Sequence, residues 1–108
     1  MKKGEIWIVA IPPTDGHEQH GTRPFIVLSD TRSMVVVGIP CTTNTRALRF
    51  PYTVSITPSR KNALEHDSIA LVLQIRAIDK KRLEKKIGIL EKVVLQKIEH
   101  KLRKLLGL

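Results

Sequence analysis

The length of 108 residues predicts one domain, residues 1–108. With 19 Lys and Arg against 10 Asp and Glu, the formal net charge is +9, which favours a polyanionic partner such as nucleic acid or an acidic protein, while a solvated, lysine-rich helix face is the alternative. Its one cysteine, Cys41, excludes an internal disulfide and is expected to be a small buried residue. No stretch approaches the roughly 18 apolar residues of a membrane span, and no signal-peptide pattern follows Met1, so we expect a cytoplasmic protein that makes no contact with a membrane.

Apolar runs bounded by turn residues predict five short strands in the first three quarters of the chain. They cover residues 5–11, 24–29, 33–40, 52–57 and 68–75. Pro12 and Pro13 close the first strand, and Gly38 is a candidate for a bulge within the third.

The character of the sequence then changes to helical. Asp79 is a good N-cap for a short helix over residues 80–86, with Gly88 as its stop, and a longer helix is expected over residues 90–106. The longer helix needs its apolar stripe covered by the end of the sheet or by a second copy of the chain. Strands followed by terminal helices predict an α+β fold with a small, barrel-like antiparallel sheet. The stripe consists of Ile87, Leu90, Val94, Ile98, Leu102 and Leu105.

A polar loop with two glycines, Gly16-His17-Glu18-Gln19-His20-Gly21, precedes the second strand and is a candidate functional segment. Arg23 follows it, at the start of that strand. Its planar fork suits two phosphate oxygens, although a structural pair with a carboxylate such as Glu18 is the alternative. His17 and His20 could carry protons. They are too few for a zinc site, and we expect no metal.

The segment Pro40-Cys41-Thr42-Thr43-Asn44 ends the third strand and turns into a basic stretch that contains Arg46 and Arg49. Its threonine hydroxyls could donate to a phosphate or cap the turn. Phe50 or Tyr52 could stack on one base. Farther along, Gln74 lies within an apolar run, where an amide needs hydrogen-bond partners, so it either ties the sheet together or contacts a base edge.

Together these segments resemble the MazF/PemK (Kid-like) family of toxin endoribonucleases. The order and spacing match over nearly the whole chain. The matching segments are Gly4-Glu5-Ile6-Trp7, Gly16-His17-Glu18-Gln19, Arg23-Pro24 with the strand that ends in Ser29, Pro40-Cys41-Thr42-Thr43, Asp67-Ser68 and Gln74-Ile75-Arg76-Ala77-Ile78-Asp79-Lys80.

The resemblance implies an SH3-like small barrel with C-terminal helices that works as a homodimer. It also implies metal-independent, cofactor-free cleavage of single-stranded RNA at short motifs, which inhibits translation and growth. The RNA's own 2′-hydroxyl attacks and leaves a 2′,3′-cyclic phosphate and a 5′-hydroxyl, and an acidic antitoxin neutralises the enzyme. The family's arginine and threonine fall on Arg23 and Thr42. Auxiliary proton transfer is left to His17, His20 or Glu18, and RNA contacts are expected from Gln19, Thr43, Asn44, Arg46, Arg49, Gln74 and Arg76.

The chain departs from the family pattern in the loop. Family members often have small residues where His17 and His20 stand, and some have a histidine where Thr22 stands. The identity of the proton-transfer group and the cleavage motif are therefore left open.

Two alternatives belong to other functional classes. Gyrase-poisoning toxins of the CcdB type have a similar fold and act through a C-terminal tryptophan, whereas this chain ends in Leu106-Gly107-Leu108 and has its only tryptophan at Trp7. A non-catalytic RNA- or protein-binding module on the same barrel is the other alternative, and the presence of both Arg23 and Thr42 counts against it.

Overall fold

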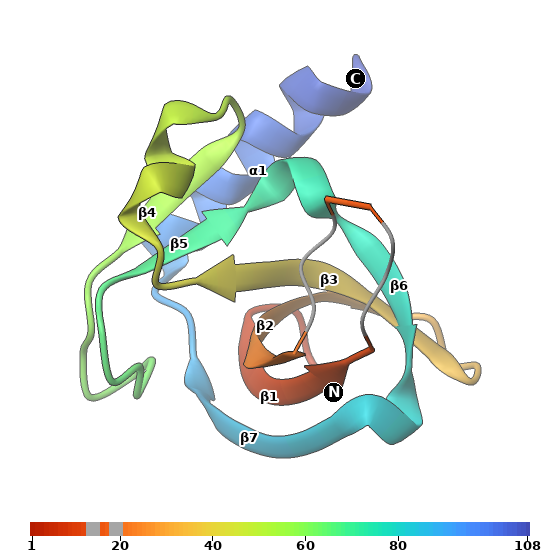
Figure 1. Ribbon diagram of the computed structural model, residues 1–108. Coiled ribbons are helices and arrows are strands. Elements are labelled where there is room, and N and C mark those ends of the chain that lie inside the picture. Colours follow the sequence, from red (N-terminus) through yellow and green to blue (C-terminus); the bar gives the residue numbers. More distant parts are fainter. Residues whose placement is uncertain (13–15, 18–20) are drawn as a thin grey trace.

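The computed structural model describes residues 1–12, 16–17 and 21–108 (Figure 1). Within these residues the chain forms strands β1 (Glu5–Ile11), β2 (Gly21–Asp30), β3 (Val35–Thr42), β4 (Thr53–Ile56), β5 (Ser68–Leu71), β6 (Arg76–Asp79) and β7 (Leu83–Ile89). One α-helix, α1 (Lys92–Leu106), follows β7. Three short 3-10 helices connect the strands: η1 (Thr45–Arg49), η2 (Val72–Gln74) and η3 (Lys80–Arg82).

The strands form one antiparallel sheet that curls on itself. Its order is β4-β5-β3-β2-β1-β7, and β6 pairs with the first half of β3. Because η3 alone joins β6 to β7, and β7 pairs with β1, this last segment closes the curl around β1 and β2 (Figure 1). The expected α+β class with a small antiparallel barrel is confirmed.

The apolar stripe of α1 packs against the chain's own sheet. Ile98 of α1 is fully buried in a cluster with Ile6 of β1 and Ile39 of β3. A second cluster fills the curl between β1, β2, β3 and β6, and contains Val9, Phe25, Val27, Val36 and Ile78. The sheet therefore has apolar side chains packed on both faces. Four residues of α1 and one of β7 also border the first cluster: Val94, Leu95, Leu102, Leu105 and Ile87.

The segment around Glu5 closes the barrel. Trp7 Nε1 donates a hydrogen bond to Glu5 Oε1 over 3.0 Å, and Lys86 Nζ on β7 lies 3.3 Å from Glu5 Oε2. The backbone N–H of Gly4 donates to Val27 O, and Gly4 O accepts from Leu90 N–H. The Gly4–Trp7 part of the family resemblance therefore has a structural explanation in this chain.

The expected helix over residues 80–86 is wrong. Asp79 does act as an N-cap, since its Oδ1 accepts from Lys81 N–H over 2.9 Å, but only one 3-10 turn follows before β7 begins at Leu83. Pairing with β1 decides the conformation, because tertiary contacts override a local helix signal. Gly88 lies within β7 rather than ending a helix, and α1 is the one C-terminal α-helix among the described residues.

The expected strand over residues 68–75 is divided. It ends at Leu71, the 3-10 helix η2 follows, and β6 starts at Arg76, so Gln74 lies at the end of η2 and not in a strand. The irregularity expected at Gly38 exists, but the extra residue lies opposite it, between Val27 and Ser29 of β2.

The described part of the chain contains no helix that is both long and apolar enough to span a membrane. Cys41 is 1% exposed, as the sequence predicted. Burial raises the pKa of its thiol to about 12.

Candidate active site

Arg23 lies near the start of β2, where it is paired in register with Val9 of β1. Its Nη1 donates to the backbone carbonyl of Cys41 over 3.4 Å, so the guanidinium is held beside the end of β3. Burial lowers the pKa of this half-buried group, but an arginine side chain remains charged at neutral pH. A fixed positive charge therefore lies next to the residue that follows Cys41, which is Thr42.

Thr42 is the last residue of β3 and is largely buried. Its Oγ1 accepts from the backbone N–H of Asn44 over 3.1 Å, so the capping role considered from the sequence is present. A hydroxyl that accepts one hydrogen bond still carries its own proton. Thr42 can therefore cap the turn and donate to a bound oxygen at the same time.

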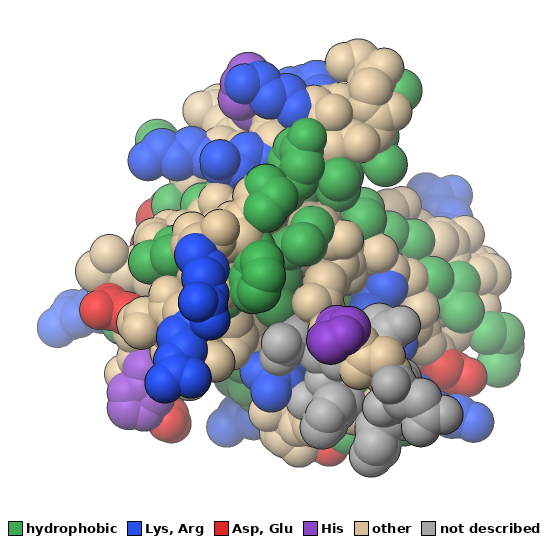
Figure 2. Space-filling view, turned by 45° about the horizontal axis from the view of Figure 1, so that its top comes forward, with side chains coloured by type: hydrophobic (Ala, Val, Ile, Leu, Met, Phe, Trp, Pro, Cys, Tyr) green, Lys and Arg blue, Asp and Glu red, His purple; other side chains and the backbone are tan. Residues whose placement is uncertain are grey.

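A cavity of about 630 Å³ opens at the end of β3, and we call it the Thr42 cavity. Its floor is apolar and its walls are polar or basic. A view of the molecule from above shows hydrophobic side chains bordered by Lys and Arg side chains and by a histidine (Figure 2). The residues that line the cavity are His17, Thr42, Asn44, Arg46, Ala47, Arg49, Phe50, Leu71, Leu73 and Gln74.

The 3-10 helix η1 positions the basic wall of this cavity. Asn44 Oδ1 caps the helix by accepting from Arg46 N–H over 3.0 Å. At its other end, the Arg49 guanidinium carbon lies 6.0 Å from the centre of the Phe50 ring, within the range of a cation–π contact. Phe50 is 54% exposed, so one face of an aromatic ring is available beside two arginines.

Gln74 connects η2 to the loop that precedes β2. Its Nε2 donates to the backbone carbonyl of His17 over 3.3 Å. Gln74 thus has a structural role, as one of the two possibilities from the sequence expected. The hydrogen bond joins η2 to a loop rather than one strand to another. Arg76 lies two residues farther on, opposite Gly38 in the β3–β6 register, and borders an adjoining cavity of about 390 Å³ together with Gln74.

Of the nine expected site residues that the structure describes, six line the Thr42 cavity, and Arg23 lies beside the end of β3. Thr43 is separate, because its side chain lines a different cavity. Glu18, Gln19 and His20 lie outside the described residues, and their expected roles stay predictions. Sequence analysis missed the apolar floor of Ala47, Leu71 and Leu73, since these residues have the pattern of ordinary core positions.

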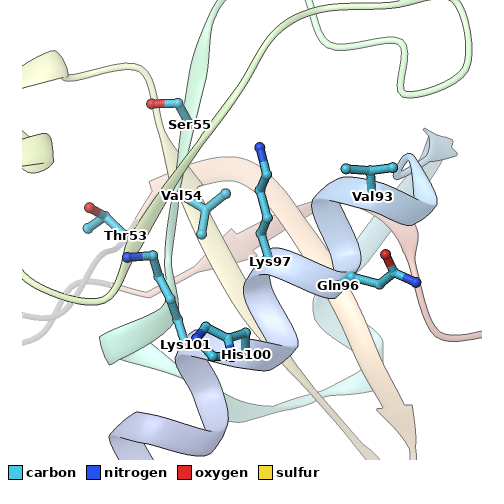
Figure 3. A pocket seen from close by; sticks show the side chains of 8 residues that line it. All are labelled: Thr53, Val54, Ser55, Val93, Gln96, Lys97, His100 and Lys101. Carbon is cyan, nitrogen blue, oxygen red and sulfur yellow. The ribbon is translucent and has the colours of Figure 1, made fainter.

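A groove of about 510 Å³ lies between α1 and β4, and we call it the α1 groove. Lys97, His100 and Lys101 of α1 face the strand that carries Thr53 and Ser55 (Figure 3). No carboxylate is among its lining residues, and it shares none of them with the Thr42 cavity. The groove is basic and distinct from the site of Arg23 and Thr42. In the described ranges no three His, Cys, Asp or Glu side chains gather where they could hold a metal ion.

Residues 2–106 match the family model of the PemK-like, MazF-like toxins of type II toxin–antitoxin systems. The chain belongs to this family. It is 31% identical to the endoribonuclease MazF of Staphylococcus epidermidis over 112 residues, which cover 100% of this chain and 92% of that protein.

Solved structures of MazF from Deinococcus radiodurans agree with this assignment. One crystal form of MazF superposes with a TM-score of 0.83 at 26% identity and covers 100% of this chain and 97% of that one. A MazE–MazF crystal form has a TM-score of 0.77 at 26% identity and covers 100% and 96%.

Proposed function

We propose that this protein is the toxin of a type II toxin–antitoxin system and cleaves single-stranded RNA in the cytoplasm as a metal-independent endoribonuclease. The observation that carries the proposal is the contact of Arg23 with the carbonyl of Cys41, because Cys41 directly precedes Thr42, which lines a cavity of suitable chemistry. Inhibition of translation and growth follows if the substrate is messenger RNA.

In the reaction, one bond to phosphorus forms and one bond to phosphorus breaks. The 2′-oxygen of the RNA bonds to the neighbouring phosphorus, and the bond to the 5′-oxygen breaks, which leaves a 2′,3′-cyclic phosphate and a 5′-hydroxyl. Negative charge builds on the non-bridging oxygens in between. Arg23 would donate two N–H groups to these oxygens, and Thr42 would donate its O–H. Preorganised donors of this kind are commonly the largest single contribution to catalysis.

A base for the 2′-hydroxyl and an acid for the 5′-oxygen are also needed. Arg23 is unsuited to the first role, because it stays protonated. His17 borders the Thr42 cavity, and its carbonyl is held by Gln74. We therefore retain His17, His20 and Glu18 as the candidates for auxiliary proton transfer.

The Thr42 cavity offers the contacts that single-stranded RNA requires. Phe50 can stack on a base, while Arg46 and Arg49 neutralise phosphates. Asn44 and Gln74 line the cavity, and their amides are the proposed contacts with base edges. Gln19, Thr43 and Arg76 complete the set of proposed RNA contacts, and no cofactor is needed for this chemistry.

An acidic antitoxin and a second copy of the chain are the proposed protein partners. The net charge of +9 and the α1 groove, whose charged lining residues are basic, favour an acidic antitoxin. The MazE–MazF complex of a relative supports the same partner. Exposed apolar side chains are consistent with a homodimer, and they include Leu48, Phe50 and Leu106.

The two other functional classes have less support. The tryptophan of this sequence, Trp7, lies in β1 and donates to Glu5, which is not the C-terminal position through which a CcdB-type gyrase poison acts. A binding-only module would not need a buried hydroxyl beside an anchored arginine.

The experiment is incubation of the purified protein with a long RNA of mixed sequence in EDTA, followed by mapping of both ends of each product. We expect discrete cuts with 5′-hydroxyl ends that disappear in Arg23→Ala and persist in Arg60→Ala, an exposed arginine remote from the site. Uncut RNA that is nevertheless bound would favour the binding module. Inhibition of gyrase supercoiling would favour the CcdB-type alternative.

A further inference from the structure

A separate cavity of about 310 Å³ lies where β1, β2 and β7 meet the connection between β4 and β5, and we call it the Thr43 cavity. Apart from Thr43, none of its lining residues has a role in the proposed function. Its apolar surface comes from Ile8, Pro24, Ala63, Leu64 and Ile87. Polar or cationic groups come from Thr43, His66, Ser68 and Lys85, and Glu65 adds one carboxylate.

The Thr43 cavity adjoins the proposed catalytic pair. Pro24 follows Arg23, and Thr43 follows Thr42. Successive side chains of an extended chain point in opposite directions. The start of β2 and the end of β3 therefore present Arg23 and Thr42 on one side, and Pro24 and Thr43 on the side of this cavity. β3 ends at Thr42, and Thr43 is exposed, so a bound strand can pass over Thr43 from one side to the other.

One row of cross-strand neighbours forms the base of the cavity. Ile8 of β1 is paired with Pro24 of β2 on one side and with Lys85 of β7 on the other. Directly opposed residues of this kind lie close together on one face of a sheet. The row therefore leads from the residue next to Arg23 to an exposed cation.

The opposite wall is held rigidly by Asn62, which is fully buried. Its Nδ2 donates to Thr57 O over 2.9 Å and to Glu91 Oε1 over 3.0 Å, and its Oδ1 accepts from the backbone N–H groups of Ser59 and Leu64 over 2.9 and 3.1 Å. Leu64 in turn packs into the main core. The wall is thus preformed and does not depend on a ligand for its shape.

The chemistry of the cavity suits one nucleotide. The pyrrolidine ring of Pro24 and the side chain of Ile8 offer an apolar surface for a base, and Lys85 offers a charge for a phosphate. His66 and Thr43 can form hydrogen bonds with base edges or a ribose. The cavity volume is at the lower end of small-molecule sites, which begin at about 300 Å³.

We propose that the Thr43 cavity binds the RNA nucleotide that lies across the cleaved phosphodiester from the nucleotides in the Thr42 cavity. The cavity makes Lys85 and His66 determinants of substrate binding and sequence preference. This inference rests on the proposed ribonuclease activity, and it adds a second binding site to the strand path. The scissile phosphate then lies between two cavities.

The test compares wild type with Lys85→Ala, His66→Ala and the control Lys81→Ala, whose side chain is 77% exposed on η3. Substrates carry the mapped motif and are shortened one nucleotide at a time from each end. We expect Lys85→Ala and His66→Ala to lower kcat/KM about tenfold on the full-length oligonucleotide, in the range expected for one stacked and charge-paired nucleotide. The loss should disappear on substrates that lack the one nucleotide which reaches the cavity.

Binding of an uncleavable RNA, with a 2′-deoxy sugar at the cleavage site, provides a second measurement. Lys85→Ala should reduce the slope of log affinity against log salt by about 0.7, as expected for one lost phosphate contact to a single strand, and Lys81→Ala should leave it unchanged. Circular dichroism and thermal unfolding verify that each variant is folded.

The outcomes separate the two proposals. If wild type cuts no RNA, the ribonuclease proposal itself fails. If wild type cuts RNA but the variants match it, or lose the same factor on every substrate length, the nucleotide site is overturned while the ribonuclease proposal stands.

Discussion

Arg23 Nη1 lies 3.4 Å from the carbonyl oxygen of Cys41, the residue that precedes Thr42. The contact joins the start of β2 to the end of β3, whose mutual position is set by strand pairing that brings Phe25 opposite Pro40. The acceptor belongs to the backbone, so it holds the guanidinium whatever side chain occupies position 41. The position of the proposed catalytic arginine is therefore set by the register of the sheet.

The first prediction concerns the geometry of the cation. Arg23→Lys keeps the charge but replaces a planar fork by a single ammonium, which cannot donate to two phosphate oxygens and to the Cys41 carbonyl in the same arrangement. We expect kcat to fall about 10²–10³-fold, as for the loss of one oxyanion donor, with a smaller effect on KM. Single-turnover cleavage of a fluorogenic oligonucleotide measures this. Full activity in the lysine variant would show that charge alone suffices.

The second prediction separates the hydroxyl of Thr42 from its shape. Thr42→Val keeps the branched side chain, removes the proposed donor and deprives Asn44 N–H of the Oγ1 acceptor, whereas Thr42→Ser keeps the hydroxyl. We expect the valine variant to lose at least about tenfold in kcat and about 0.5–1.5 kcal/mol of stability, and the serine variant to stay close to wild type. Equal activity of the two variants would remove Thr42 from the mechanism.

The third prediction concerns stability at low pH. Lys80 Nζ donates to Asp30 Oδ1 over 2.6 Å, and Arg32 N–H donates over 2.9 Å, which lowers the pKa of Asp30 from 3.8 to about 2. A carboxyl group whose pKa is lower in the folded than in the unfolded state stabilises the fold at pH values above its unfolded-state pKa. This stabilisation is lost as the pH falls through the folded-state pKa. The Tm of Asp30→Asn should lie below that of wild type at pH 6, and the gap should close between about pH 4 and pH 2.

Glu84→Gln, at an exposed position of β7, is the control for this measurement. Its Tm should follow wild type at every pH. A gap for Asp30→Asn that stayed constant down to pH 2 would contradict the role of the Asp30 charge.

The fourth prediction concerns close packing at Gly38. A Cβ there would lie 2.3 Å from Ile26 O and 2.4 Å from an edge carbon of the Phe25 ring. Relieving these contacts would require both the backbone at Ile26 and the buried ring of Phe25 to shift, which costs free energy. Gly38→Ala should therefore lower the free energy of unfolding by at least about 1–3 kcal/mol. Urea unfolding of this variant measures the change, with Ser55→Ala at an exposed position of β4 as the control. An unchanged midpoint would mean that the sheet opens at this position without strain.

Local patterns were sufficient for several elements. The first strand was predicted with its observed bounds, because Pro12 ends an uninterrupted apolar run. The last helix was predicted from its stripe and differs by two residues at its start. The candidate site residues were chosen from local motifs and the family resemblance, and six of them line the Thr42 cavity at the end of β3.

Local patterns failed where distant segments compete for the chain. Residues 80–86 follow the helix cap Asp79 and include helix-forming lysines. Most of them nevertheless pair with β1 as part of β7, because the open edge of β1 needs partners for its backbone groups. The role of Asn62 was also missed. Its importance depends on Glu91, 29 residues away, and no spacing in the sequence indicates that contact.

The sequence by itself determined the class of fold, the basic charge and the residues from which a site could be built, since these depend on composition, periodicity and motif. The tertiary structure decided which of those residues meet. Thr42 and Thr43 are neighbours in sequence but face different cavities, and Arg23 and Cys41 are 18 residues apart but in contact. Strand register and side-chain alternation cause both results, and they exist only once β1, β2 and β3 have paired.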